Sequence, residues 1–139
     1  MGFTIDIDTT AVKAKFDKAK DQMQSTMSNE LNRFAVLAVN QAKLFTTPNV
    51  NLGFLRNSIH FEPSTPETLR VQIAVSAFYA AYIEFGTGIF AASYVPTLPP
   101  EWQKLAMQHF VSGKGRGRQH PFLFPAIEIN IEKLKERLK

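Results

Sequence analysis

The chain has 139 residues, of which 45% are hydrophobic and 20% charged, and it contains no cysteine. That length predicts a single domain, 1–139, and the lack of cysteine excludes disulfides, thiolate zinc sites and cysteine nucleophiles. Sixteen Lys and Arg against twelve Asp and Glu give a net charge of +4, all of it from cations between Trp102 and His120. No apolar run approaches the roughly 18 residues of a membrane span. The first ten residues also lack the basic and apolar regions of a signal peptide, so we expect no membrane partner.

The N-terminal third of the sequence predicts a short strand followed by a long helix. Apolar and polar residues alternate over 3–7, as in a strand. Thr10–Phe45 has no Pro or Gly and repeats apolar residues every three or four positions, which predicts one amphipathic helix about 50 Å long. A domain of this size has a radius of gyration of only about 14 Å. We therefore expect the apolar second half in the core, with Met27, Leu31 and Phe34 buried, and the first half in solvent or against another chain.

The middle of the chain predicts a hairpin and a short helix. After a Pro- and Asn-containing loop at 46–53, two strand-like runs at 55–62 and 69–76 flank a Pro-rich turn, which favours antiparallel pairing. The apolar and aromatic run at 77–85 fits a helix better than a strand, and the Gly-Thr-Gly sequence at 86–88 would end it.

A long connection at 89–120 separates this region from the C-terminal helix. It contains a possible short helix at 101–111 and then a run that alternates Gly with cations, which predicts an exposed, mobile loop. Residues 121–125 suggest a brief extended segment, and 126–139 repeat apolar residues with helical spacing. The fold class is therefore α+β: a long N-terminal helix packed on a small antiparallel sheet, with a short middle helix and a C-terminal helix.

Evidence for catalysis in the sequence is weak. His60, His109 and His120 have no spacing typical of zinc ligands, so we expect no metal. Glu84 lies in a strongly apolar run where burial would raise its pKa, but it has no carboxylate partner in sequence, and a structural or interface role is the commoner alternative. The aromatic residues around it could line a ligand groove, although core or interface packing is more usual. We predict a protein that is not an enzyme and has no cofactor.

The basic run is the best candidate for binding phosphates. Lys114, Arg116 and Arg118 lie among glycines that permit close approach, and several cations would release counterions from DNA. No aromatic residue is interleaved with them, so base stacking is not indicated. The alternative is a solvated loop whose charges only keep it soluble.

Three segments resemble conserved blocks of one known family. The sequence GFLRNSI at 53–59 resembles a TG-x-LR-x-SI block, and YAAYIEFGT at 79–87 resembles YA-x-YVEFGT. PFLFPA at 121–126 resembles a PFL-x-PA block that leads into a C-terminal helix. In this order, behind a long helix, they resemble the tail-completion and head–tail joining (neck) proteins of long-tailed bacteriophages and prophages. Leu52 replaces the usual Thr, and the connection after Gly88 is long for the family.

The resemblance implies a non-enzymatic virion protein, made in the bacterial cytoplasm, that forms a ring, expected to be a hexamer. Its partners would be other copies of itself, the head connector or stopper, and the tail tube or tail terminator. The expected interface and assembly residues are Arg56, Tyr79, Tyr82, Glu84, Phe85, Gly86, Thr87 and Phe122. Lys114, Arg116 and Arg118 would face DNA passing through the lumen. Two alternatives remain: a small nucleic-acid-binding module that uses the 113–120 loop, and another structural role such as a minor capsid protein.

Overall fold

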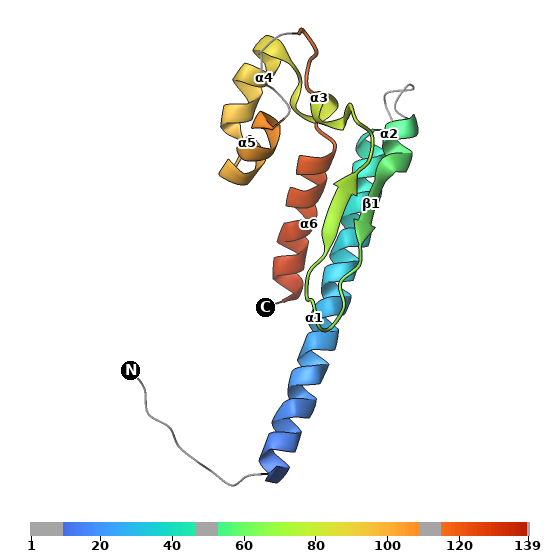
Figure 1. Ribbon diagram of the computed structural model, residues 1–139, viewed down its shortest axis with the longest axis vertical. Helices are drawn as coiled ribbons and strands as arrows, with labels where there is room; N and C mark the ends of the chain where they lie inside the picture. Colours follow the sequence, from blue (N-terminus) through green and yellow to red (C-terminus); the bar gives the residue numbers. More distant parts are fainter. Residues whose placement is uncertain (1–9, 47–52, 109–114, 139) are drawn as a thin grey trace, which may run out of the picture.

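A computed structural model describes residues 10–46, 53–108 and 115–138 and has the predicted α+β architecture (Figure 1). In chain order its elements are α1 (Thr10–Phe45), α2 (Gly53–Ser58), β1 (Ile59–Glu62), β2 (Gln72–Val75), α3 (Ala80–Phe85), α4 (Gly88–Tyr94), the 3-10 helix η2 (Val95–Thr97), α5 (Pro100–Met107) and α6 (Leu123–Arg137). Helix α1 runs along most of the length of the molecule, and α6 and the β1–β2 hairpin pack along its second half (Figure 1). Helices α3 to α5 lie at the end of the molecule opposite the start of α1 (Figure 1). The predicted strand at 3–7 lies outside the described residues.

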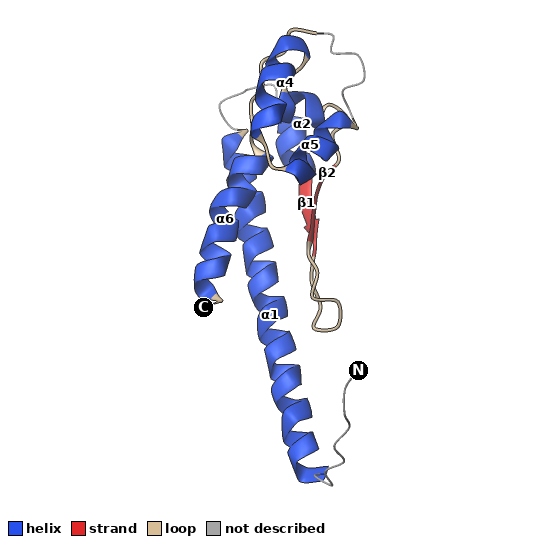
Figure 2. Ribbon diagram, turned by 90° about the vertical axis from the view of Figure 1, so that its left-hand side faces the viewer, coloured by secondary structure: helices blue, strands red, loops and turns tan. Residues whose placement is uncertain are grey.

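The two halves of α1 differ in burial, as the sequence predicts. Ser28 is the first buried residue among the described side chains of the helix, and the turns before it extend beyond the rest of the fold (Figure 2). Phe34 is buried as predicted, whereas Met27 and Leu31 are only half-buried. Further along α1, small buried residues (Ala35, Ala38, Ala42) allow close approach of the packed elements.

Polar contacts hold two other elements against α1. Arg137 Nε of α6 donates to Glu30 Oε2 at 2.6 Å. At the hairpin tip, Asn32 Nδ2 donates to the Ser64 carbonyl at 3.0 Å, and the Ser64 N–H donates to Asn32 Oδ1 at 2.7 Å. This reciprocal pair satisfies both backbone groups of a buried turn residue and fixes where the hairpin lies along the helix.

The hairpin is shorter than the sequence predicts. Residues 55–58 belong to α2 rather than to a strand, and the Ser58 hydroxyl donates to the Leu55 carbonyl at 2.8 Å. At the other strand, Leu69 has a φ of 47° and follows a turn, so pairing starts only at Gln72. The antiparallel register pairs Ile59 with Val75 and Glu62 with Gln72. Period-2 alternation alone could not reveal this positive φ.

The connection at 89–120 contains more structure than expected. Helix α4 and η2 were not predicted, and α5 ends at Met107 rather than near residue 111; residues 109–114 are outside the described part. Helix α6 begins at Leu123, so the prediction of an extended segment at 121–125 is wrong. Pro125 fits there because a proline in the first helical turn removes no helical hydrogen bond.

The interior has two apolar clusters. The first joins Val39 and Ala42 of α1 to Leu55, Ile59 and Phe122. The second cluster lies under α5 and contains Phe85, Leu98, Ala106, Trp102 and Phe124. Helices α3 and α6 contribute to both clusters. The contact between α3 and α6 therefore determines how the α4–α5 region packs against the rest of the fold.

Candidate assembly site

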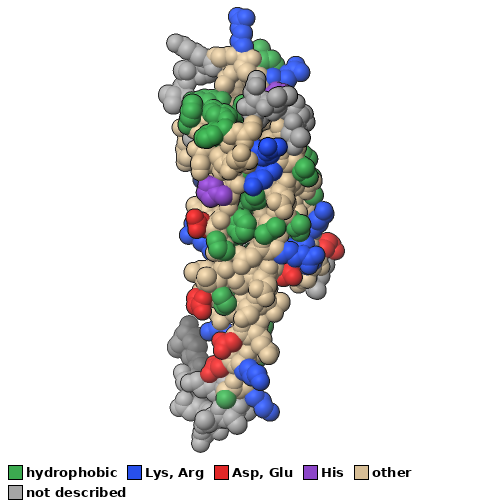
Figure 3. All heavy atoms as spheres, turned by 90° about the vertical axis from the view of Figure 1, so that its right-hand side faces the viewer, with side chains coloured by type: hydrophobic (Ala, Val, Ile, Leu, Met, Phe, Trp, Pro, Cys, Tyr) green, Lys and Arg blue, Asp and Glu red, His purple; other side chains and the backbone are tan. Residues whose placement is uncertain are grey.

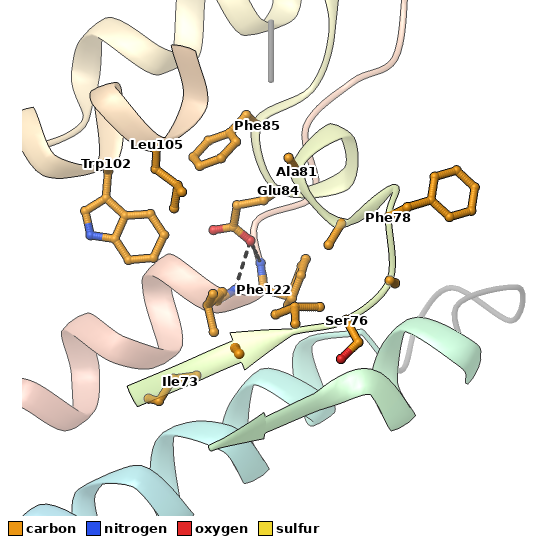
Figure 4. A pocket seen from close by; sticks show the side chains of 14 residues that line it. Ile73, Ser76, Phe78, Ala81, Glu84, Phe85, Trp102, Leu105 and Phe122 are labelled. Atoms are coloured by element: carbon orange, nitrogen blue, oxygen red, sulfur yellow. Dashed lines mark hydrogen bonds between the residues drawn. The ribbon is translucent and has the colours of Figure 1, made fainter. Parts of the chain in front are cut away.

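Glu84 joins the second and third sequence blocks directly. Its Oε2 accepts hydrogen bonds from the N–H groups of Phe122 at 2.8 Å and Leu123 at 2.9 Å (Figure 4). Its Oε1 accepts a hydrogen bond from Phe124 N–H at 2.8 Å. These three residues are the N-cap and first two positions of α6, whose N–H groups have no partner within the helix. No side chain of α6 itself caps this end, so a carboxylate from α3 caps it instead.

Burial and hydrogen bonding have opposite effects on the pKa of the Glu84 carboxyl group. Only 3% of Glu84 is exposed, and desolvation raises its pKa above 4.5. The N–H groups of Leu123, Phe122 and Phe124 each lower the pKa, but their effect is smaller. Burial also raises the pKa of Tyr94, with a second contribution from the charge of Glu84. Because both Glu84 oxygens accept bonds from α6, the geometry supports a structural function rather than acid–base chemistry.

The Gly86-Thr87 step binds the end of the basic run. Thr87 N–H donates to the Gly117 carbonyl at 2.8 Å, and Gly117 N–H donates back to Thr87 Oγ1 at 2.6 Å. Gly86 has a φ of 78°, and a Cβ there would lie 2.9 Å from both the Gln119 nitrogen and the Gly117 oxygen. His120 N–H also donates to the Ile83 carbonyl at 2.7 Å. Residues 115–120 therefore lie against α3 and the start of α4, which the prediction of a mobile loop did not anticipate.

The cations of this segment are on the surface. Arg116 and Arg118 are exposed, and the Arg118 guanidinium carbon lies 5.4 Å from the centre of the Phe90 ring, within the range of a cation–π contact. Lys114, the third predicted DNA-facing residue, lies outside the described residues. The structure thus brings Arg116 and Arg118 to one exposed segment that Thr87 holds through Gly117.

An aromatic patch, which we define as Phe54, Phe78, Tyr79 and Tyr82, covers the junction of α2 and α3. Phe78 is 86% exposed and Phe54 66%, and the Tyr79 ring lies 5.3 Å from Phe78 and 6.4 Å from Phe54. Hydrophobic side chains gather on the upper part of the face in Figure 3, while charges of both signs follow the lower part of α1. Such exposed aromatic groups are typical of surfaces that contact other proteins.

The predicted interface residues fall into two groups. Tyr82 and Arg56 are exposed and Tyr79 is half-buried, so these can contact a partner. Glu84, Phe85, Gly86 and Phe122 are buried within the chain, and Thr87 is half-buried. Their position predicts an indirect effect on assembly, through the shape of the subunit.

An apolar groove lies between β2, α3 and α5. It has a volume of about 390 Å³, and Trp102 and Leu105 of α5 face Ile73 of β2 across it, with Glu84 between them (Figure 4). Glu84, Phe85 and Phe122 of its lining were predicted from sequence as interface residues, whereas Ile73, Trp102 and Leu105 were not. The useful signals were the only Trp of the chain, two residues after Pro99–Pro100, and the apolar alternation at 69–76.

Metal and membrane sites are not found in the described residues. No group of three or more His, Asp or Glu side chains could hold a metal ion there. His60 and His120 are exposed and His109 is outside the described residues. None of the described helices is long and apolar enough to cross a membrane.

Comparison with known families gives one match. The family described as "Bacteriophage HK97-gp10, putative tail-component" matches residues 10–86, more than half of the chain. The chain belongs to this family. It is therefore a structural tail component of a bacteriophage, and as a tail component it is part of the virion. The match spans α1 through α3 and includes the first sequence block and the second up to Gly86, whereas Thr87 and the third block lie beyond it. No curated protein and no solved structure matches the chain.

Proposed function

We propose that this tail component is a neck or tail-completion subunit that joins the head connector to the tail tube. The observation that carries the proposal is the separation of two uncovered surfaces. The first half of α1 projects from the body, and the aromatic patch lies at the other end of the fold (Figure 1). A closed ring built head to tail needs two different surfaces on each subunit, and these two fit that requirement.

The proposed assembly is a ring, with a hexamer as the working stoichiometry, held between the connector or stopper and the tail tube or terminator. The whole chain, 1–139, would act as one domain without catalytic activity. Contacts between α1 and α6 support this, because they join the two ends of the described chain. Membership of a tail-component family favours this function over a nucleic-acid-binding module.

Arg116 and Arg118 are proposed to face DNA that passes through the ring. Their exposed side chains lie on a Gly-containing segment without regular secondary structure, where contact with phosphates needs no base recognition. Such contact would be weak, independent of sequence and sensitive to salt.

Immunogold labelling of tailed particles tests the proposed location. Antibodies raised against this protein should place gold at the head–tail junction. Gold distributed along the tail tube, or confined to the distal tip, would contradict the neck function and leave only the broader tail function. Particles that lack the protein, built with an early stop codon, are the control for antibody specificity.

A further inference from the structure

The outer edge of β2 has free hydrogen-bonding groups beside the apolar groove. The Ser76 N–H donates to the Ser58 carbonyl, and in this register those two residues are opposite each other. In an antiparallel pair such hydrogen-bonded positions alternate with positions whose N–H and C=O point outward. Ile73 and Val75 occupy the outward positions, and no hydrogen bond to their backbone is found among the described residues. A two-stranded sheet with a free edge can accept a third strand.

The groove follows this edge rather than one face of the sheet. Consecutive residues from Ile73 to Phe78 line it, and consecutive strand residues point to opposite faces. Only a groove along the backbone edge of β2 can contact residues from both faces of the sheet. Trp102 and Leu105 form its far wall, and Figure 2 shows α5 above the hairpin.

The chemistry of the groove fits an apolar strand better than a small polar ligand. Glu84 is the only ionisable side chain in its lining, and both of its oxygens already accept bonds from α6. A polar ligand would have no charged group left to orient it. An extended segment would instead bond to the Ile73 and Val75 backbone and place its apolar side chains in the groove.

Residues 3–7 have the required pattern, with Phe3, Ile5 and Ile7 separated by polar residues. They cannot reach the groove of their own chain. The hairpin packs beside Val39, and from Thr10 to Val39 α1 rises about 44 Å at 1.5 Å per residue. Seven extended residues before Thr10 span at most about 25 Å.

We propose that residues 3–7 of a second copy of this chain add as a third strand to the β2 edge and fill the groove. The inference rests on the proposed function, because the strand would be the contact that links neighbouring subunits. It also gives the projecting first half of α1 a function, because Thr10, at the start of that helix, lies at the end of α1 away from the packed body and so toward a neighbour.

Cross-linking in assembled particles tests the contact. The chain has no cysteine, so a Thr4→Cys/Ser76→Cys variant carries only the two introduced thiols. Thr4 alternates with the apolar residues, and Ser76 is exposed at the groove. Treating tailed particles with a short bismaleimide should give a ladder of covalent multimers on a denaturing gel. The matched Thr4→Cys/Ser93→Cys variant, with its second thiol exposed on α4, should give no ladder.

Adding Ile5→Asp to the reactive pair separates a specific contact from chance proximity. The proposal predicts that this change abolishes the ladder, because a carboxylate would enter an apolar groove. Joined particles that contain the Thr4→Cys/Ser76→Cys protein but give no ladder would overturn the strand exchange and leave the neck function intact. Particles in which this protein is absent from the neck would instead contradict the proposed function.

Discussion

The cap that Glu84 places on α6 gives the sharpest test of how this fold is held together. Glu84→Gln keeps the size of the side chain but turns one acceptor oxygen into an NH₂ group facing an N–H donor. At least one buried N–H of Phe122, Leu123 or Phe124 then loses its partner. Leaving one buried polar group unsatisfied costs about 1–3 kcal/mol. Glu84→Ala should cost more, about 3–5 kcal/mol, because all three donors lose their acceptor.

Urea denaturation followed by Trp102 fluorescence measures this loss. Trp102 is the only tryptophan, and its ring lies 5.1 Å from Phe124, whose N–H bonds to Glu84. The exposed Glu67→Gln is the matched control and should change the free energy of unfolding by less than about 0.5 kcal/mol. If Glu84→Gln unfolds at the same urea concentration as the wild type, the hydrogen bonds from Glu84 to α6 do not stabilise the fold.

The pH dependence follows from the raised pKa of Glu84. Since burial raises the folded-state pKa above 4.5, the folded chain binds this proton more tightly than the unfolded chain does. The contribution of Glu84 to stability is thus fully present below pH 4.5 and declines as pH rises through the folded pKa. The stability difference between wild type and Glu84→Gln should narrow over that range. If the difference in the free energy of unfolding instead widens as pH rises, the three N–H donors affect the pKa of Glu84 more than burial does.

Three further variants test other parts of the structure and of the proposed function. Gly86→Ala should destabilise the fold by about 1–3 kcal/mol in urea denaturation, because its φ is positive and a Cβ would collide with the opposing backbone. Gly53→Ala is the control, since no atom of the described residues lies within 4 Å of a Cβ there, and an equal loss of stability for this variant would refute the prediction. Phe34→Ala should cost about 3–5 kcal/mol by opening a cavity beneath α1, and wild-type melting would show that the helix is wrongly placed. Replacing both Arg116 and Arg118 by Ala should reduce the slope of log K for DNA binding against log salt concentration by about two units. An unchanged slope would show that these two side chains do not contact DNA phosphates.

How much of the fold the sequence predicts depends on the range of the interactions involved. The long uninterrupted periodicity of Thr10–Phe45 predicted α1 with the bounds that the structure has, and the more apolar second half predicted which part of the helix is buried. The start of α6 was missed because its cap comes from Glu84, which is 38 residues before the N-cap residue Phe122. No local pattern predicts the hydrogen bonds between Thr87 and Gly117, which lie 30 residues apart. Tertiary hydrogen bonds of this kind leave no local periodicity.

In the candidate site too, local features could be predicted from sequence and features that depend on tertiary contacts could not. The aromatic and YIEFGT residues were selected from sequence, but the pattern could not tell exposed Tyr82 from buried Phe85 within one short helix. That distinction depends on α5, whose Trp102 packs against Phe85 with ring centres 6.4 Å apart. The free edge of β2 also depends on pairing register, which a single strand-like run does not specify.

Electron microscopy of particles from a phage or induced prophage with an early stop codon in this gene tests the central claim most directly. The account predicts DNA-filled heads and separate, complete tails that fail to join, because the missing subunit would link connector and tail tube. Restoring the gene on a plasmid should restore joined particles. Intact tailed particles without the protein would contradict the neck function.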